Sequence, residues 1–234
     1  MSAMRNILAI MLTAVLLCVT GLWPLHAAGQ LISITTASDL AFPVAQTPPG
    51  YIPQPAKTQA ITTAMLQPVI GKAMLEKFQK SGYIAGYHGW MDATDPSHAA
   101  FATYDLFGFN TINGAQIARL AYQTLVQGLQ SQIPDPALPK SAVIWTDNTG
   151  TFGADNQPYA VAEILFRVAN VVGDVTGFAD GNDQTATDLA LQQATGITVA
   201  CVHWLTTLRT TSHQTIVPFA PLALLLPAQR RRKH

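Results

Sequence analysis

The sequence predicts an α+β fold, in which a mainly antiparallel sheet of about five strands packs with two to four helices. Three features predict this class. Apolar residues recur at helical spacing in residues 57–80 and 113–132. Runs rich in aromatic residues at 83–91 and 99–109 indicate strands, and residues 158–178 alternate as a β-hairpin does.

The N-terminus, residues 1–28, is predicted to be a secretory signal sequence. Arg5 is its one charged residue, an apolar run follows from Ile7, and the segment ends on small residues at Ala28. An uncleaved membrane anchor and lipidation at Cys18 are the alternatives. The signal predicts an exported protein, which is periplasmic, at the cell surface or secreted.

The remainder divides into three parts. Residues 29–56 are rich in proline and predict an extended lead-in, residues 57–208 a single α+β domain, and residues 209–234 an apolar and basic tail. Residues 92–188 hold 11 Asp and Glu against 3 Lys and Arg, a net charge of 3 − 11 = −8. An acidic body excludes a nucleic-acid groove, which needs clustered cations. Cys201 is the one cysteine outside the signal, so the domain has no internal disulfide.

The first helix, over residues 57–80, is expected to kink at Pro68 and Gly71. A second helix is predicted from an N-cap at Asn113 to about Gln132.

Between these helices, residues 92–97 are a turn by composition, so the strands at 83–91 and 99–109 form an antiparallel pair. Residues 141–146 are a further short strand, and residues 147–158 are expected to be a loop.

Residues 158–178 allow two interpretations. As a helix, the segment begins with Pro158 at its first position. As a hairpin, which we favour, it turns at Ala169 and Asn170. The hairpin pairs Val168 with Val171, Phe166 with Gly173 and Ile164 with Val175 on one face, and Glu163 with Thr176, Leu165 with Asp174 and Arg167 with Val172 on the other. Residues 183–194 are then a helix, which can continue past Gly196 to Leu208.

Three short motifs carry a family resemblance. They are Gly82–Tyr87, Tyr104–Phe107 followed by Gly114 and Ala115, and Phe166–Val172. With this order of elements, residues 57–194 resemble extracytoplasmic sensor-like α+β domains of actinobacteria, namely the ectodomains of membrane serine/threonine kinases and related secreted lipoproteins. The resemblance implies a binding or sensing module and no catalytic residue. A lipobox and disulfides, which are common in these proteins, are absent here.

The candidate ligand-binding residues come from the densest aromatic stretch, residues 83–109, with Trp145 in addition. Tyr87, His88, Trp90, Tyr104 and Trp145 combine aromatic surface with glycines that allow a ligand to approach closely. Packing of these side chains in the core is the alternative.

No metal site is expected, and the weak candidates surround one turn: His88, Asp92, Asp95 and His98. No Walker-type loop or dinucleotide fingerprint occurs, so we expect no cofactor.

The sequence therefore predicts an exported, non-enzymatic domain that binds an unidentified small ligand or an envelope protein, and no nucleic acid. One alternative is a hydrolase of unrecognised type that uses the acidic loops 147–155 and 174–183. The other is a structural subunit of a cell-envelope assembly. The tail, an apolar run that ends in Arg230–Lys233, has the composition for peripheral membrane contact or for sorting.

Overall fold

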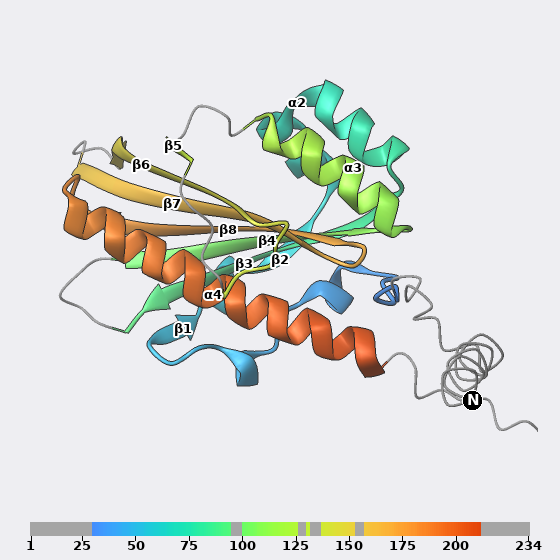
Figure 1. The fold of residues 1–234 in the computed structure, drawn as a ribbon, viewed down its shortest axis with the longest axis horizontal. Coiled ribbons are helices and arrows are strands. Elements are labelled where there is room, and N and C mark those ends of the chain that lie inside the picture. Colours follow the sequence, from blue (N-terminus) through green and yellow to red (C-terminus); the bar gives the residue numbers. More distant parts are fainter. Residues whose placement is uncertain (1–29, 95–99, 126–129, 132–136, 153–156, 212–234) are drawn as a thin grey trace, which may run out of the picture.

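The computed structural model describes residues 30–94, 100–125, 130–131, 137–152 and 157–211. These residues form one antiparallel sheet with helices on both of its faces (Figure 1). The α+β class is confirmed. The predicted signal sequence lies outside the described residues, as does the tail from residue 212. Within the described residues, no helix combines the length and apolar character needed to cross a membrane.

The sheet has eight strands in the order β1-β3-β4-β8-β7-β6-β5, and β2 pairs with β3. Five of the strands are 10 to 12 residues long, which matches the five predicted; the other three have at most three residues, too few to produce a recognisable alternation. The strands are β1 (Tyr51–Pro53), β2 (Gln59–Ile61), β3 (Tyr83–Ala93), β4 (Ala100–Phe109), β5 (Gln130–Ser131), β6 (Val143–Phe152), β7 (Gln157–Val168) and β8 (Val171–Asp180).

The β7–β8 hairpin confirms the favoured interpretation of residues 158–178, and all six predicted strand pairs occur in the structure. The turn at Ala169 and Asn170 places Ala169 in the left-handed region, with φ 50°. This conformation costs a residue with a Cβ roughly 1–2 kcal/mol, so the surrounding contacts must hold it. The predicted antiparallel pair of β3 and β4 is also confirmed.

Three α-helices accompany the sheet: α2 (Thr63–Lys80), α3 (Ile112–Gln123) and α4 (Gln184–Thr211). The predicted kink in α2 is confirmed at Gly71, whose φ of 77° interrupts the helix. The last helix does continue past Gly196.

The predicted N-cap of α3 at Asn113 is wrong. Thr111 has extended backbone angles, and its Oγ1 accepts a hydrogen bond from Gly114 N at 2.9 Å. Thr111 is therefore the cap, and Asn113 lies inside the first turn.

The predicted extent of this helix, to Gln132, is also wrong. The helix ends at Gln123, and Gln130 and Ser131 pair with Thr146 and Trp145 of β6. Strand pairing thus replaces the helical continuation that the apolar spacing indicated. The loop expected over residues 147–158 is wrong in the same way, because β6 continues through a register shift at Asp147–Gly150 to Phe152.

The two faces of the sheet have different covers. The long helix α4 and the lead-in pack on one face, around side chains such as Leu106, Ile164 and Val175. On the opposite face, α2 and α3 pack over Phe107, Leu165 and Val172. Figure 1 shows these two helices together at one end of the sheet, and no helix of the described residues covers the other end of their face.

The lead-in is built into the fold. The side chain of Asn170 accepts a hydrogen bond from Ile32 N at 2.7 Å and donates to Ile32 O at 3.0 Å, as a neighbouring strand would. Asn170 also donates to Phe109 O at 2.8 Å. Leu40 and Phe42 follow in the core against α4, and Phe42 contacts Trp204 edge to face.

Candidate functional site

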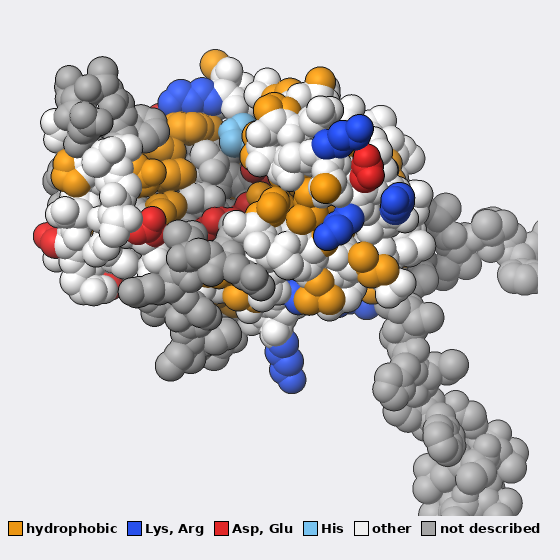
Figure 2. Space-filling model, turned by 90° about the horizontal axis from the view of Figure 1, so that it is seen from above, with side chains coloured by type: hydrophobic (Ala, Val, Ile, Leu, Met, Phe, Trp, Pro, Cys, Tyr) orange, Lys and Arg blue, Asp and Glu red, His pale blue; other side chains and the backbone are white. Residues whose placement is uncertain are grey.

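The face that carries α2 and α3 also carries a group of acidic side chains. Asp105 on β4 lies opposite Asp174 on β8, and Glu163 on β7 lies one step diagonally from Asp174. Because alternate residues of a strand share a face, these three carboxyl groups point to the same side of the sheet. We call them the acidic floor. Figure 2 shows this face hollowed beside the helices, with acidic side chains inside the hollow.

Asp174 is the most deeply placed member, at 6% exposure. Its Oδ2 accepts a hydrogen bond of 2.8 Å from the Tyr122 hydroxyl on α3. Its Oδ1 receives no donor from the described residues, and the carboxyl group of Glu163 lies within hydrogen-bonding reach of it. Two carboxyl groups in contact bond to each other only when one of them holds a proton.

Burial determines the protonation of this pair. It raises the pKa of Asp174 well above its usual range, and the negative charges of Glu163 and Asp105 raise it further. Burial, together with the charge of Asp105, raises the pKa of Glu163 to about 7. The pair therefore holds a proton more tightly than two exposed carboxyl groups would, and a nearby positive charge favours its release.

A histidine borders the acidic floor. His88 on β3 lies opposite Asp105, and its Nδ1 is 2.7 Å from Asp105 Oδ1. This hydrogen bond raises the pKa of His88, although partial burial opposes the effect. His88 and Asp105 thus act as a charge pair when the ring is protonated.

An aromatic row crosses the same face. Trp90, Phe101, Phe178 and Tyr159 come from β3, β4, β8 and β7 in that order. The rings of Trp90 and Phe101 stack at 4.3 Å between centroids, and those of Phe101 and Phe178 at 4.4 Å. Tyr159 continues the row at 5.9 Å from Phe178. We call these four residues the aromatic row.

The aromatic row and the acidic floor are neighbours. Phe101 and Phe178 are four residues from Asp105 and Asp174 along their strands, which is roughly 13 Å. Glu163 lies between the two groups, in the register position next to Thr176. Glu163 is thus two residues, roughly 7 Å, from the level of Phe178 along the sheet.

Charged groups fix the outer end of the row. Lys57 Nζ lies 4.2 Å from the centre of the Trp90 ring. The indole Nε1 of Trp90 donates to Asp92 Oδ1 at 2.6 Å. Trp90 therefore contacts both Lys57 and Phe101 through the faces of its ring.

The five predicted ligand-binding residues do not come together. His88 and Trp90 lie on the open face, and Trp145 lies on the same side but is 3% exposed, packed in the core under α2 and α3. Tyr87 and Tyr104 point to the opposite face, where Tyr104 packs against Phe42. The strand period of two separates residues that are adjacent in sequence.

The sequence interpretation missed two members of the floor, Asp105 and Glu163, and it assigned Asp174 to an acidic loop over 174–183 where the structure has strand β8. Asp174 and Glu163 each interrupt an apolar strand, in Val171–Val175 and in Ala160–Phe166. An ionisable residue within such a run, with its side chain on a covered face, was the signal that could have identified them. Tyr122 gave no signal, because an aromatic residue on the apolar face of a helix is indistinguishable from core.

The weak metal candidates are engaged elsewhere. His88 bonds to Asp105, Asp92 accepts from Trp90, and Asp95 and His98 lie outside the described residues. Among the residues that the structure describes, no group of three His, Cys, Asp or Glu is arranged to hold a metal ion.

The acidic loops of the hydrolase alternative meet through a hydrogen bond from Asn148 to Asn182 O at 3.1 Å. The loop expected over residues 174–183 is strand β8 as far as Asp180, and Asp174 at its start belongs to the acidic floor. Of the other described carboxylates, Asp147 accepts from Thr149, and Asp183 caps α4 through Ala186 N. Asp180 is exposed, and Asp155 lies outside the described residues. No buried carboxyl pair forms among the described residues of these loop ends.

No protein-family model matches the chain, and no curated protein matches it. Among solved structures, the chain is similar to the extracellular domain of PknH from Mycobacterium tuberculosis, with a TM-score of 0.40 and 12% sequence identity. The match covers 69% of this chain and 84% of that chain. With this TM-score and identity, the likeness assigns neither a family nor a ligand to this chain.

Proposed function

We propose that the protein is an exported, non-enzymatic binding domain that takes a small organic cation on the open face of its sheet. The observation that carries the proposal is the carboxyl pair of half-buried Glu163 and buried Asp174, placed within one small molecule's length of the aromatic row. The signal pattern of residues 1–28 supports export.

The charge of the floor favours a cation. Three carboxyl groups converge there, and the neighbouring cationic groups are His88 and, beyond Trp90, Lys57. Burial makes a second negative charge on Glu163 and Asp174 unfavourable unless a positive charge compensates it. An ammonium group supplies that compensation and favours release of the proton that the pair holds. The aromatic row then offers apolar ring edges to the body of the same ligand.

A specific observation supports one other function. A carboxyl group with a pKa of about 7, beside a buried carboxyl group and a tyrosine, is the type of group that serves as a general acid or base. A hydrolase that uses Glu163 together with Asp174, the first residue of the acidic segment 174–183, is therefore the second candidate.

The direct test is a titration with benzyltrimethylammonium, a cation with an aromatic body, followed by isothermal calorimetry and amide NMR shifts. We expect binding that perturbs amides of β4 and β8 and tightens as the pH rises through about 7, because Glu163 then loses its proton. The neutral analogue benzyl alcohol should bind at least tenfold more weakly.

Matched variants locate the site. Glu163→Gln should weaken binding of the cation about tenfold, since it removes a charge and keeps the shape. Asp188→Asn, which changes an exposed acid of α4, should leave binding unchanged. Equal affinity for benzyl alcohol and the cation would contradict the proposal. Hydrolysis of ester or glycoside substrates that is lost in Glu163→Gln would establish the enzyme instead.

A further inference from the structure

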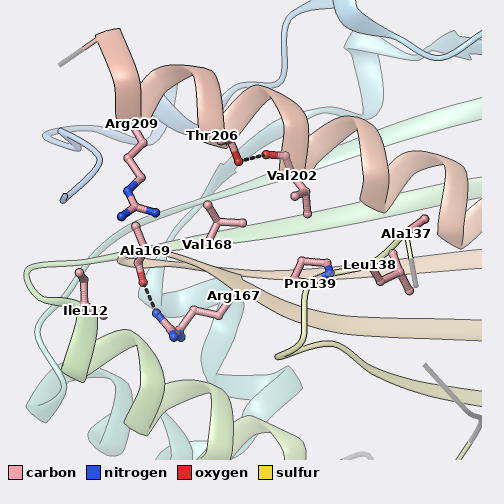
Figure 3. A pocket seen from close by; sticks show the side chains of 10 residues that line it. All are labelled: Ile112, Ala137, Leu138, Pro139, Arg167, Val168, Ala169, Val202, Thr206 and Arg209. Atoms are coloured by element: carbon pink, nitrogen blue, oxygen red, sulfur yellow. Dashed lines mark hydrogen bonds between the residues drawn. The ribbon is translucent and has the colours of Figure 1, made fainter. Parts of the chain in front are cut away.

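A pocket separate from the acidic floor opens at the β7–β8 turn. It has a volume of about 540 Å³ and is lined by four segments: Ile112 at the start of α3, residues 137–139, residues 167–169 of the hairpin, and Val202, Thr206 and Arg209 of α4 (Figure 3). This volume is in the range of pockets that hold small organic molecules. Arg167 and Glu163 are four residues apart on β7, roughly 13 Å, so the two sites are distinct.

Two guanidinium groups reach this pocket. Arg167 donates from Nη1 to Ala169 O at 2.8 Å and from Nε to Gln116 Oε1 at 3.0 Å, which fixes its plane and leaves Nη2 unused by these bonds. Arg209 makes no hydrogen bond with a described residue. Figure 3 shows Arg209 reaching down from α4 and Arg167 lying below the turn, on either side of Ala169. Among the described residues, no carboxylate pairs with either arginine.

A third arginine adds to the positive charge. Arg119 on α3 is 7% exposed, and its Nη1 donates to the carbonyl oxygen of Ser141 and to Gln123. Its Nε is buried and has no partner among the described residues. Burial lowers the pKa of Arg119, and the nearby charge of Arg167 lowers it further. The hydrogen-bond partners of Arg119, Ser141 and Gln123, are not anions. The cluster of Arg119, Arg167 and Arg209 therefore has an uncompensated positive charge.

The rest of the lining is apolar. Val168, Ala169 and Val202 flank the arginines, and Leu138 and Pro139 close the far side. Ile112 begins α3, whose N-terminal end carries a partial positive charge. The combination selects a ligand with a negative group and an apolar body.

We propose that this pocket binds an organic anion, a carboxylate or a phosphate monoester with an apolar portion, through Arg167 and Arg209. The planar guanidinium group matches both kinds of head group with paired hydrogen bonds. Arg167 is held in advance by Gln116 and Ala169, so ordering it on binding costs little entropy.

Calorimetric titration of the protein tests this proposal with three probes: phenyl phosphate, hexanoate and inorganic phosphate. We expect phenyl phosphate or hexanoate to bind, with an affinity that falls as salt is added. Inorganic phosphate, which lacks an apolar portion, should bind at least tenfold more weakly than the better of the two. Equal affinity for inorganic phosphate would overturn the assignment of an organic anion.

Two substitutions locate the pocket. Arg209→Gln removes a charge that makes no internal hydrogen bond with a described residue, and it should weaken binding at least tenfold. Its matched control is Lys80→Gln, which removes an exposed cation from the last turn of α2 and should leave binding unchanged. Arg167→Lys retains the charge, loses the planar fork and should weaken binding severalfold. Wild-type affinity in both arginine variants, or no binding of either organic probe at millimolar concentration, would overturn the proposal.

Discussion

The hydroxyl of Tyr122 donates a 2.8 Å hydrogen bond to Asp174 Oδ2, and thereby joins α3 to the middle of the sheet across 52 residues of sequence. Tyr122→Phe removes the donor and leaves a carboxyl oxygen buried without one. We expect the free energy of unfolding to fall by about 1–3 kcal/mol, measured by urea denaturation at pH 7. The pKa of Asp174 should rise further, because the Tyr122 bond lowers it.

Tyr51→Phe is the matched control for this prediction. Tyr51 is also partly buried, and its hydroxyl makes no hydrogen bond with a described residue, so the loss should be under about 0.5 kcal/mol. Equal losses in the two variants would show that the Tyr122 bond contributes nothing specific.

The stability of the fold should fall as the pH rises from 4.5 to 7. Glu163 has an ordinary pKa of 4.5 when unfolded and a pKa of about 7 in the fold, so the folded protein holds a proton that the unfolded chain releases in this window. Raising the pH then favours unfolding. Glu163→Gln removes this contribution. We expect it to be more stable than the wild type at pH 8, by about 1–3 kcal/mol, with a smaller gap at pH 5.

His88 contributes in the same direction and can be separated. Its pKa is raised in the fold by Asp105, so its stabilisation is complete below its unfolded pKa of 6.5 and is lost as the pH rises through the higher folded value. Thermal melts of His88→Gln should show a weaker dependence above pH 6.5 than the wild type and keep the part due to Glu163. An unchanged pH profile in Glu163→Gln would contradict the raised pKa of that residue.

Asn170→Ala should strongly destabilise the protein. It removes three buried hydrogen bonds, two to Ile32 and one to Phe109, and leaves backbone groups unsatisfied. We expect a loss of at least about 3 kcal/mol in chemical denaturation, with amides near Ile32 losing protection from hydrogen exchange first. Asn148→Ala, which removes an exposed bond, serves as the control and should cost less than about 0.5 kcal/mol. Similar losses in the two variants would contradict the importance of the lead-in.

Gly177→Ala and Gly196→Ala should have opposite effects. A Cβ at Gly177 on β8 would collide with the carbonyl oxygen of Ala190, so α4 would have to move away from the sheet, at a cost of about 1–3 kcal/mol. At Gly196 the nearest atom is the Tyr51 hydroxyl at 3.8 Å, so alanine fits there. It should stabilise α4 by about 0.5–1 kcal/mol, because it removes the entropic cost of a helical glycine. If the melting temperatures of the two variants shift in the same direction, the close approach at Gly177 is contradicted.

Local patterns predicted much of the fold. The alternation on either side of Ala169 and Asn170 gave the register of the longest hairpin, and Gly71 marked the break in α2. Prediction failed where long-range pairing decides structure. The segment at Gln130 has helical spacing, yet it pairs with Thr146, and no local signal reports a partner 16 residues away.

The candidate site was only partly predictable. His88 and Trp90 were identified from composition, and both lie on the open face. Whether Asp174 and Glu163 meet depends on β8 pairing with both β4 and β7, which places Asp105 and Glu163 on either side of Asp174. That arrangement follows from the order of the strands in the sheet, which local patterns in a single sequence do not predict.

The position of β8 between β4 and β7 has a consequence for the synthesis of the chain. The β3–β4 hairpin can form once residue 109 has left the ribosome, but the free edge of β4 must wait until residues 171–180 arrive. The contact of Ile32 with Asn170 waits equally long. During that interval the nascent protein exposes an aromatic strand edge open to wrong pairing. A holding chaperone, or export in an unfolded state, would protect the chain until β8 completes the sheet.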